Sequence, residues 1–152
     1  RDEWNADRAL PWELLEHAPH AGVQRLVRDL NRVLRACPAL HELDASPEGF
    51  GWIDHVDAAH SILVFERRAT SGERVLVLCN FTPVARPGYG LPLPAHLPRA
   101  WSLRLNSAAP AFCGEPDLAA AQASAAPSPW VGDGASLSLD LPPMSTLFLL
   151  PA

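Results

Sequence analysis

The sequence predicts a mainly β protein, in which an antiparallel β-sandwich of the Greek-key type follows a loop and one long helix. Short segments with alternating apolar and polar residues recur after residue 46, and turn residues separate them. Most of the 16 prolines lie beyond residue 80, where they exclude long helices. A sustained apolar period of 3.6 residues occurs only before this region. The change of period predicts two domains, residues 1–45 and residues 46–152.

The first 19 residues are rich in large side chains but have no sustained period, so we expect a structured loop with one short helix. Trp4 and Trp12 stand there beside amide and carboxylate groups. Sugars bind such surfaces, because their C–H faces lie on aromatic rings and their hydroxyls pair with polar groups. The alternative is that both tryptophans only pin the loop against another part of the protein.

Residues 20–37 form the predicted helix, which ends near Cys37 because Pro38 has no backbone donor to continue it. An apolar stripe of this kind needs a partner surface. The irregular segment before the helix and the short strands after it offer little cover, so we expect the helix to be the last piece of a larger body. The stripe consists of Val23, Leu26, Val27, Leu30, Val33, Leu34 and Cys37.

Seven short strands are expected after residue 46. Residues 70–73 are typical of a hairpin turn, and Pro92 confines the fourth strand to a sheet edge. The composition of residues 107–133, which is biased to Ala, Ser and Pro, predicts a long surface loop. The expected strands are 50–54, 60–68, 74–81, 89–93 and 100–106, followed by 137–141 and 146–150 as a final hairpin.

Composition excludes several classes of partner. The net charge is −5, from 12 basic and 17 acidic residues, and this argues against a nucleic-acid partner, which needs a concentrated positive surface. No apolar run approaches the roughly 20 residues that cross a bilayer, and the charged start of the chain is unlike a signal peptide. Cys37, Cys79 and Cys113 are odd in number and widely spaced, which favours reduced thiols in a cytoplasmic protein.

The residues of this chain predict no catalytic centre and no metal or cofactor site. A retaining glycosidase needs two carboxylates about 5 Å apart in a cleft. Glu42 and Asp44 follow the helix, and Asp54 and Asp57 follow a strand, so we expect all four to be solvated surface groups. His17 and His20 lack a third metal ligand. The cysteines stand in apolar contexts that do not activate a thiol.

Four blocks of residues stand in a fixed order between residues 3 and 86. They are Glu3-Trp4-Asn5-x-Asp7 with Leu10, Trp12, Leu14 and Leu15; the helix residues from His20 to Asn31 with Pro38-Ala39-Leu40-His41-Glu42 and Asp44; Pro47-x-Gly49-Phe50-x-Trp52; and Asn80-Phe81-Thr82-Pro83-Val84-x-Arg86. In residues and spacing these blocks resemble the C-terminal part of the bacterial glycogen branching enzymes, the 1,4-α-glucan branching enzymes of the α-amylase superfamily.

The resemblance implies a layout and an activity. The first residues would follow the eighth strand of a (β/α)8 barrel, the helix would be its last helix, and the remainder would be the all-β domain after the barrel. Such enzymes move an α-1,4-glucan chain to a 6-hydroxyl and so form α-1,6 branches in glycogen, by double displacement on an Asp nucleophile with a Glu acid–base. These carboxylates come from earlier strands, so none is assigned here. Glu3, Trp4 and Asn5 would open on the catalytic face and touch the glucan.

Other interpretations stay open at this point. Asn106-Ser107-Ala108 and Phe112-Cys113-Gly114 depart from the family's usual N-T-D and Y-G-G, so no role is carried over to the loop that follows. Related debranching or trehalose-forming enzymes have a similar tail, although the first and fourth blocks favour branching. A further alternative is a stand-alone, non-catalytic glucan-binding β module. Such a module would bind glycogen by itself, and alanine at Trp101 or Trp130 would weaken that binding. A severed segment would instead be inactive and poorly soluble.

Overall fold

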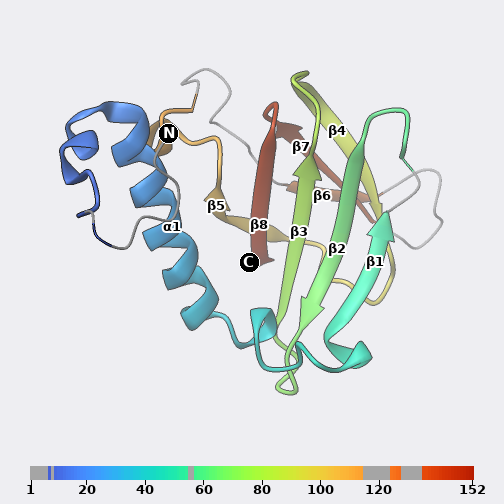
Figure 1. Ribbon diagram of the computed structural model, residues 1–152. Helices are drawn as coiled ribbons and strands as arrows, with labels where there is room; N and C mark the ends of the chain where they lie inside the picture. Colours follow the sequence, from blue (N-terminus) through green and yellow to red (C-terminus); the bar gives the residue numbers. More distant parts are fainter. Residues whose placement is uncertain (1–6, 8, 55–56, 115–123, 128–134) are drawn as a thin grey trace.

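The computed structural model describes residues 7, 9–54, 57–114, 124–127 and 135–152. These residues form a two-layer β-sandwich with one long helix on its outer side (Figure 1). The helix is α1 (Ala18–Ala36), and short 3-10 turns flank it and the strands. These turns are η1 (Trp12–Glu16), η2 (Pro38–Leu40), η3 (Pro47–Gly49) and η4 (Pro110–Phe112).

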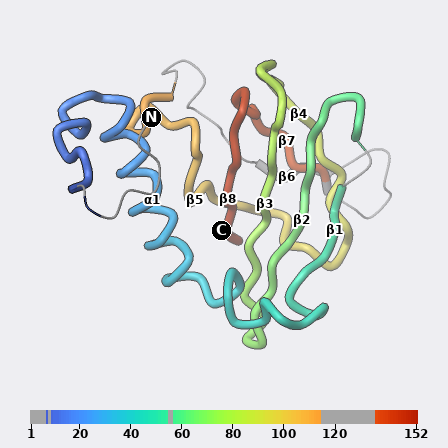
Figure 2. The backbone as a smooth tube through the Cα atoms, in the orientation of Figure 1, coloured from blue at the N-terminus to red at the C-terminus, as the bar shows by residue number. Residues whose placement is uncertain are grey.

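Two antiparallel sheets make up the sandwich, as the sequence predicts. The larger sheet has the order β1 (Phe50–Asp54), β2 (Ile62–Arg68), β3 (Arg74–Asn80), β8 (Ser145–Pro151) and β5 (Trp101–Asn106). The smaller sheet has the order β4 (Arg86–Leu93), β7 (Ala135–Leu141) and β6 (Ser124–Pro127). The chain crosses between the sheets after β3, β4, β5 and β7, a path that Figure 2 follows as a tube. Pro92 therefore lies on an edge strand, as expected.

The main core lies between the two sheets. Ile62 and Val64 on β2 point into it, while Leu63 and Phe65 between and after them point to the outer face, as a period of two requires. Burying each large aliphatic side chain contributes about 1.5–3 kcal/mol to folding. The fully buried members from both sheets include Ile62, Leu76, Leu78, Leu91, Leu93, Leu137, Leu141, Leu147 and Leu149.

The outer face of the larger sheet carries a second core, which α1 and η2 cover (Figure 1). Pro19 stands in the first turn of α1, where its missing donor costs nothing, and Pro38 stops the helix after Cys37. The expected stripe is divided lengthwise. Its covered side packs on the sheet, while its other side is exposed. The covered residues are Leu26, Leu30, Val33 and Cys37, and the exposed residues are Val23, Val27 and Leu34.

Three sequence-based expectations about the fold were wrong. The helix starts at Ala18 rather than at residue 20. The last two strands do not form a hairpin, because β7 pairs with β4 and β6 while β8 pairs with β3 and β5. The stretch 107–133 is not loop throughout: it holds η4 and the strand β6. Two short leucine-rich strands separated by two prolines are compatible either with a hairpin or with a connection that crosses from one sheet to the other. The prolines favour the crossing connection, because they have no backbone N–H to donate in a hairpin turn.

Candidate functional site

The residues expected to touch substrate, Glu3, Trp4 and Asn5, lie outside the described part of the chain. The described chain resumes with η1, the short helical turn expected in this segment, which lies beside α1. Leu10 and Trp12 are largely exposed there. Exposed apolar side chains therefore occur both at η1 and on α1.

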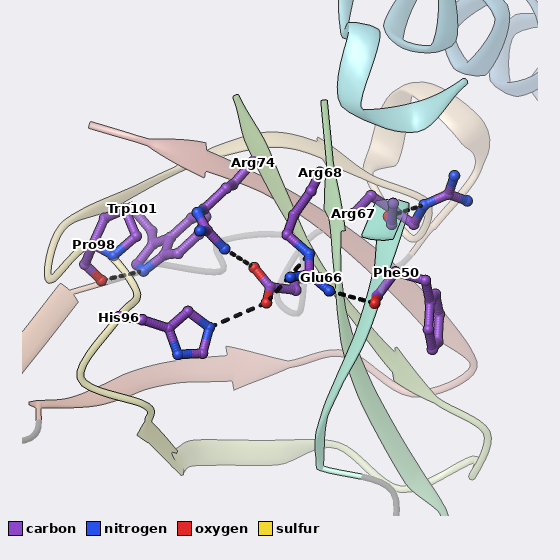
Figure 3. Close-up of polar contacts among 9 residues, drawn as sticks. Phe50, Glu66, Arg67, Arg68, Arg74, His96, Pro98 and Trp101 are labelled. Carbon is purple, nitrogen blue, oxygen red and sulfur yellow. Dashed lines mark hydrogen bonds and ion pairs between the residues drawn. The ribbon is translucent and has the colours of Figure 1, made fainter. Parts of the chain in front are cut away.

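Glu66 on β2 is the most buried charged side chain among the described residues, with 2% of it exposed. Figure 3 shows two arginines and one histidine around it. Arg74 on β3 donates to one oxygen, His96 Nε2 lies 3.1 Å from the other, and Arg68 Nε lies 3.8 Å away. His96 belongs to the β4–β5 connection, so the group ties both sheets together. A carboxylate whose two oxygens already contact cations is a structural group rather than a catalytic acid.

A second polar group joins the β1–β2 connection to β4. Asp57 contacts His60 Nδ1 at 2.7 Å and accepts a 3.1 Å hydrogen bond from the Tyr89 hydroxyl. Burial raises the pKa of Asp57, but the bonds from His60 and Tyr89 outweigh it and hold that pKa below its ordinary value. Burial and the carboxylates of Asp57 and Asp54 raise the pKa of Tyr89. A charged carboxylate and a neutral phenol fix the loop, and Asp57 is not the freely solvated group expected from the sequence.

Cys37 and Cys79 are buried thiols whose pKa values lie above the ordinary value. Burial is the largest cause that raises the pKa of Cys37, and the nearby Glu73 carboxylate raises it further. The charge of Arg104 lowers the pKa by less than these two raise it. Burial also raises the pKa of Cys79, against a hydrogen bond from Thr146. Protonated thiols are poor nucleophiles. No set of three His, Cys, Asp or Glu side chains in the described ranges could hold a metal ion.

Three aromatic side chains form an aromatic patch on the outer face of the larger sheet at its β1 edge: Phe50, Trp52 and Phe65. The Phe50 ring is 4.9 Å from that of Trp52, edge to face, and 5.4 Å from that of Phe65, stacked. Trp52 remains 51% exposed. Arg67, which pairs with Phe50 in the register, forms an ion pair with Asp44 at the border. An exposed indole backed by rings, with charged groups beside it, suits the apolar face and the hydroxyls of a sugar.

Of the two tryptophans named for a stand-alone glucan-binding module, Trp101 is not available to a sugar. Trp101 is 3% exposed and its indole N–H donates to the Pro98 carbonyl at 2.9 Å, so it belongs to the core. Trp130 lies outside the described residues. The signal for Trp52 was present in residues 50–54: two aromatic residues two positions apart share one face of a strand, while Ile53, which follows Trp52, turns inward.

The geometry therefore offers two surfaces, the aromatic patch and the exposed side of α1 with η1. None of the helices in the described ranges has both the length and the apolar character needed to cross a bilayer.

Comparison with known proteins places the chain in a family. The model of the alpha amylase C-terminal all-beta domain matches residues 52–152. The chain belongs to this family, which agrees with the observed sandwich.

Individual relatives extend the match to almost the whole chain. A 1,4-alpha-glucan branching enzyme GlgB of Cereibacter sphaeroides is 45% identical over 150 residues, which are 99% of this chain and 20% of the relative. The protein of the same description from Pseudomonas putida is 45% identical over 152 residues, with the same two shares. That of Aquifex aeolicus is 44% identical over 148 residues, 97% of this chain and 23% of the relative. The expected resemblance to branching enzymes is confirmed, and the chain spans about one fifth of the length of these relatives.

Proposed function

We propose that this chain is the C-terminal accessory part of a 1,4-α-glucan branching enzyme, here called the parent protein. It would form the end of the catalytic body with residues 1–45 and the following β domain with residues 46–152. The support comes from relatives of that description, which resemble the chain over nearly all its length while extending far beyond it. The parent protein would move α-1,4-glucan chains to 6-hydroxyls in the cytoplasm.

The observation that carries this proposal is the divided stripe of α1. Val23, Val27 and Leu34 lie along one helix edge and are exposed, although the opposite edge of the same stripe is well packed. The neighbouring η1 adds Leu10 and Trp12 to this surface. Apolar side chains gathered on one helix face favour burial against a partner. The partner we assign is the catalytic body, and the chain's own sheet covers the other half of the stripe.

This chain would not itself perform the transfer. Its buried carboxylate, Glu66, is engaged by cations, and the remaining candidates hold loops in place. We therefore infer that the catalytic carboxylates lie in the rest of the parent protein and that the 152 residues alone are inactive. The same proposal assigns Glu3, Trp4 and Asn5 to the substrate side of that body.

A second role follows from the aromatic patch. Trp52 offers an exposed ring, and Arg67 and Asp44 offer charged groups for sugar hydroxyls nearby. The patch would hold an outer glucan chain away from the reaction centre, which raises its local concentration for the transfer.

Docking of α1 is tested with Val27→Asp in the parent protein. The charge would be buried at the contact, so we expect a thermal midpoint several degrees lower and slower formation of α-1,6 branches from amylose, counted by NMR. Gln24→Asp, which adds the same charge on the polar side of α1, is the control. If both variants behave like the wild type, α1 does not face the catalytic body. If the wild-type parent protein opens α-1,6 bonds instead of forming them, it is a debranching enzyme and the proposed activity is wrong.

Glucan binding is tested by affinity electrophoresis of the parent protein in gels that contain glycogen. Trp52→Ala should lose most of the retardation that this patch contributes, roughly a few-fold in apparent affinity for one stacking residue. Trp52→Phe is the matched control, because it keeps an aromatic ring at the same exposed position, and it should retain most of the retardation. Equal retardation of wild type and Trp52→Ala would reject the patch as a glucan site.

A further inference from the structure

Three segments at one end of the sandwich contain no charged residue. They are residues 80–85, residues 107–114 and residues 142–145, in a chain with 12 basic and 17 acidic side chains. The β3–β4 connection, the β7–β8 turn and η4 follow one another along the upper edge of Figure 1, at the same end as the start of α1. We call these three segments the charge-free rim.

Buried hydrogen bonds hold the charge-free rim in one conformation. Asn80, 1% exposed, donates to the carbonyls of Val84 and Pro142, both at 2.9 Å, and accepts from the Thr82 backbone and hydroxyl. The Met144 amide donates to the Thr82 carbonyl at 2.8 Å, which joins two of the segments. A surface that is already ordered binds without the entropic cost of ordering it.

The same hydrogen bonds leave apolar side chains pointing outward. Phe81 and Val84 are exposed, and Met144 is 68% exposed. Met144 also has a φ of 46°, in the left-handed region that methionine rarely adopts. The Met144 amide keeps its hydrogen bond to the Thr82 carbonyl, but the side chain is left exposed. Strained positions that the surrounding structure enforces often serve function.

The charge-free rim is continuous with the start of α1. Arg25 Nε donates to the Ala111 carbonyl at 2.7 Å, and Cys113 Sγ lies 3.1 Å from the Ala18 carbonyl. Gly22 allows this close approach, since a Cβ there would lie 2.9 Å from the Phe112 carbonyl oxygen. A pocket of about 280 Å³ lies between residues 107–114 and the prolines of the β7–β8 turn.

Charged groups stand at the border of the rim rather than in it. On one side the Phe81 amide bonds to the Ser61 carbonyl, next to His60 and Asp57. On the other side lies Arg25 of α1. An apolar centre with a polar border is the usual anatomy of a protein–protein contact.

A glucan fits the rim less well than a protein does. Sugar recognition needs free polar groups, but those of the rim are used inside it: Thr82 Oγ1 donates to Asn80, Ser145 Oγ donates to the Pro142 carbonyl, and Ser107 Oγ accepts from the Thr146 amide. About four fifths of the length of the relatives lies outside the match with this chain. We take the protein partner of the rim from that part.

We propose that the charge-free rim is a second docking surface for the catalytic body, so that the body spans from α1 across η4 to Phe81 and Met144 and places an apolar side chain in the pocket beside the β7–β8 turn. This inference rests on the proposed function. It assigns a role to the Asn80-Phe81-Thr82-Pro83-Val84 block: Asn80 fixes the loop, and Phe81 and Val84 make the contact.

The test compares single charges placed in the parent protein. Met144→Asp puts a charge at the centre of the rim, and Asp accepts the left-handed backbone better than Met, so misfolding of the turn does not explain a loss. We expect a thermal midpoint several degrees lower and increased hydrogen exchange in peptides of the catalytic body. Met144→Asn should give a smaller shift of the same sign. Ser71→Asp, at the exposed β2–β3 turn of the opposite end, is the control and should change neither readout.

Val27→Asp separates this inference from the proposed function. If Val27→Asp lowers the midpoint and Met144→Asp does not, the body docks on α1 alone and the rim inference is wrong. If neither variant has an effect, both proposals fail. If Met144→Asp weakens retardation by glycogen but leaves the midpoint and the hydrogen exchange unchanged, the rim is a glucan surface and the docking inference is also overturned.

Discussion

The two ends of the sandwich treat their side chains in opposite ways. At the end that holds the β2–β3 turn, Glu66 gathers Arg68, Arg74 and His96, and Arg67 pairs with Asp44. At the other end the charge-free rim buries its polar groups and exposes its apolar ones. The charged end pairs its charged groups within the chain. The rim pairs its polar groups within the chain too, but it leaves Phe81, Val84 and Met144 exposed. We therefore expect the charged end to face water and the rim to contact another part of the parent protein.

Removing Glu66 should have the largest effect on the charged end. Glu66→Ala removes the carboxylate that Arg68, Arg74 and His96 contact, and we expect a loss of about 2–4 kcal/mol in the free energy of unfolding, since the arginines can reach water in part. Urea unfolding of the 152-residue chain measures it. Glu13→Ala, an exposed residue of η1, should change the stability by less than about 0.5 kcal/mol. Equal effects would mean that the cations of this end do not depend on Glu66.

Removing Asn80 is the corresponding change at the rim, and we expect a smaller loss. Asn80→Ala removes one donor from each of two carbonyls and the acceptor of the Thr82 amide, which costs about 2–3 kcal/mol in the same measurement. Asn31→Ala on the exposed side of α1 is the control and should be neutral or slightly stabilising.

Asn80→Asp tells whether the donated bonds are the important ones. A carboxylate would face two carbonyl oxygens, so its pKa in the folded chain should rise above the unfolded value. The folded state then binds more protons, and the variant should lose stability as the pH rises from 4 to 7. A variant whose stability relative to wild type does not change over that range would contradict the assigned roles of the amide.

A gain in stability is expected from the strained position of the rim. Met144→Asn should raise the free energy of unfolding of the 152-residue chain by about 0.5–1 kcal/mol, because Asn tolerates the left-handed backbone. Met144→Ala keeps the strain and removes the side chain, so it should give no gain. If Ala and Asn behave alike, the backbone at this position is not the source of the effect.

The smallest effect should come from Asp57 at the edge of the rim. Its lowered pKa contributes stability that is present above the unfolded value of about 3.9 and is lost as the pH falls through the folded value. Asp57→Asn should remove this part of the acid dependence. The change should stay below about 1 kcal/mol, because His60 is half exposed. Unfolding curves between pH 2.5 and 5 measure it, and parallel curves for both proteins would contradict it.

The sequence predicted the strands and the helix because their periods are local. Residues 62–68 and 74–80 alternate along the chain, and the stripe of α1 repeats every turn, so neither needs knowledge of a partner. Which strand pairs with which is a property of the whole fold. Residues 137–150 alone do not reveal that β8 pairs with β3 and β5 in the larger sheet rather than with β7.

The surfaces were harder to predict than the elements. Val33 and Val27 belong to one stripe, and only the packing of the sheet shows that one is covered and the other exposed. Trp101 and Trp52 both stand on strands, but the first lies at a position that faces the core. The role of Asn80 was also hidden, because the Pro142 carbonyl that it binds is 62 residues away. The boundary near residue 45 stays a prediction.

The position of β8 has a consequence for how the protein is made. Residues 145–151 lie between β3 and β5, so the larger sheet stays split in two until they are in place. During synthesis β3 therefore waits with an unpaired edge while some 65 further residues emerge, roughly three to thirteen seconds at ordinary elongation rates. Partly made chains expose that edge, and this interval is when we expect a chaperone to be most needed.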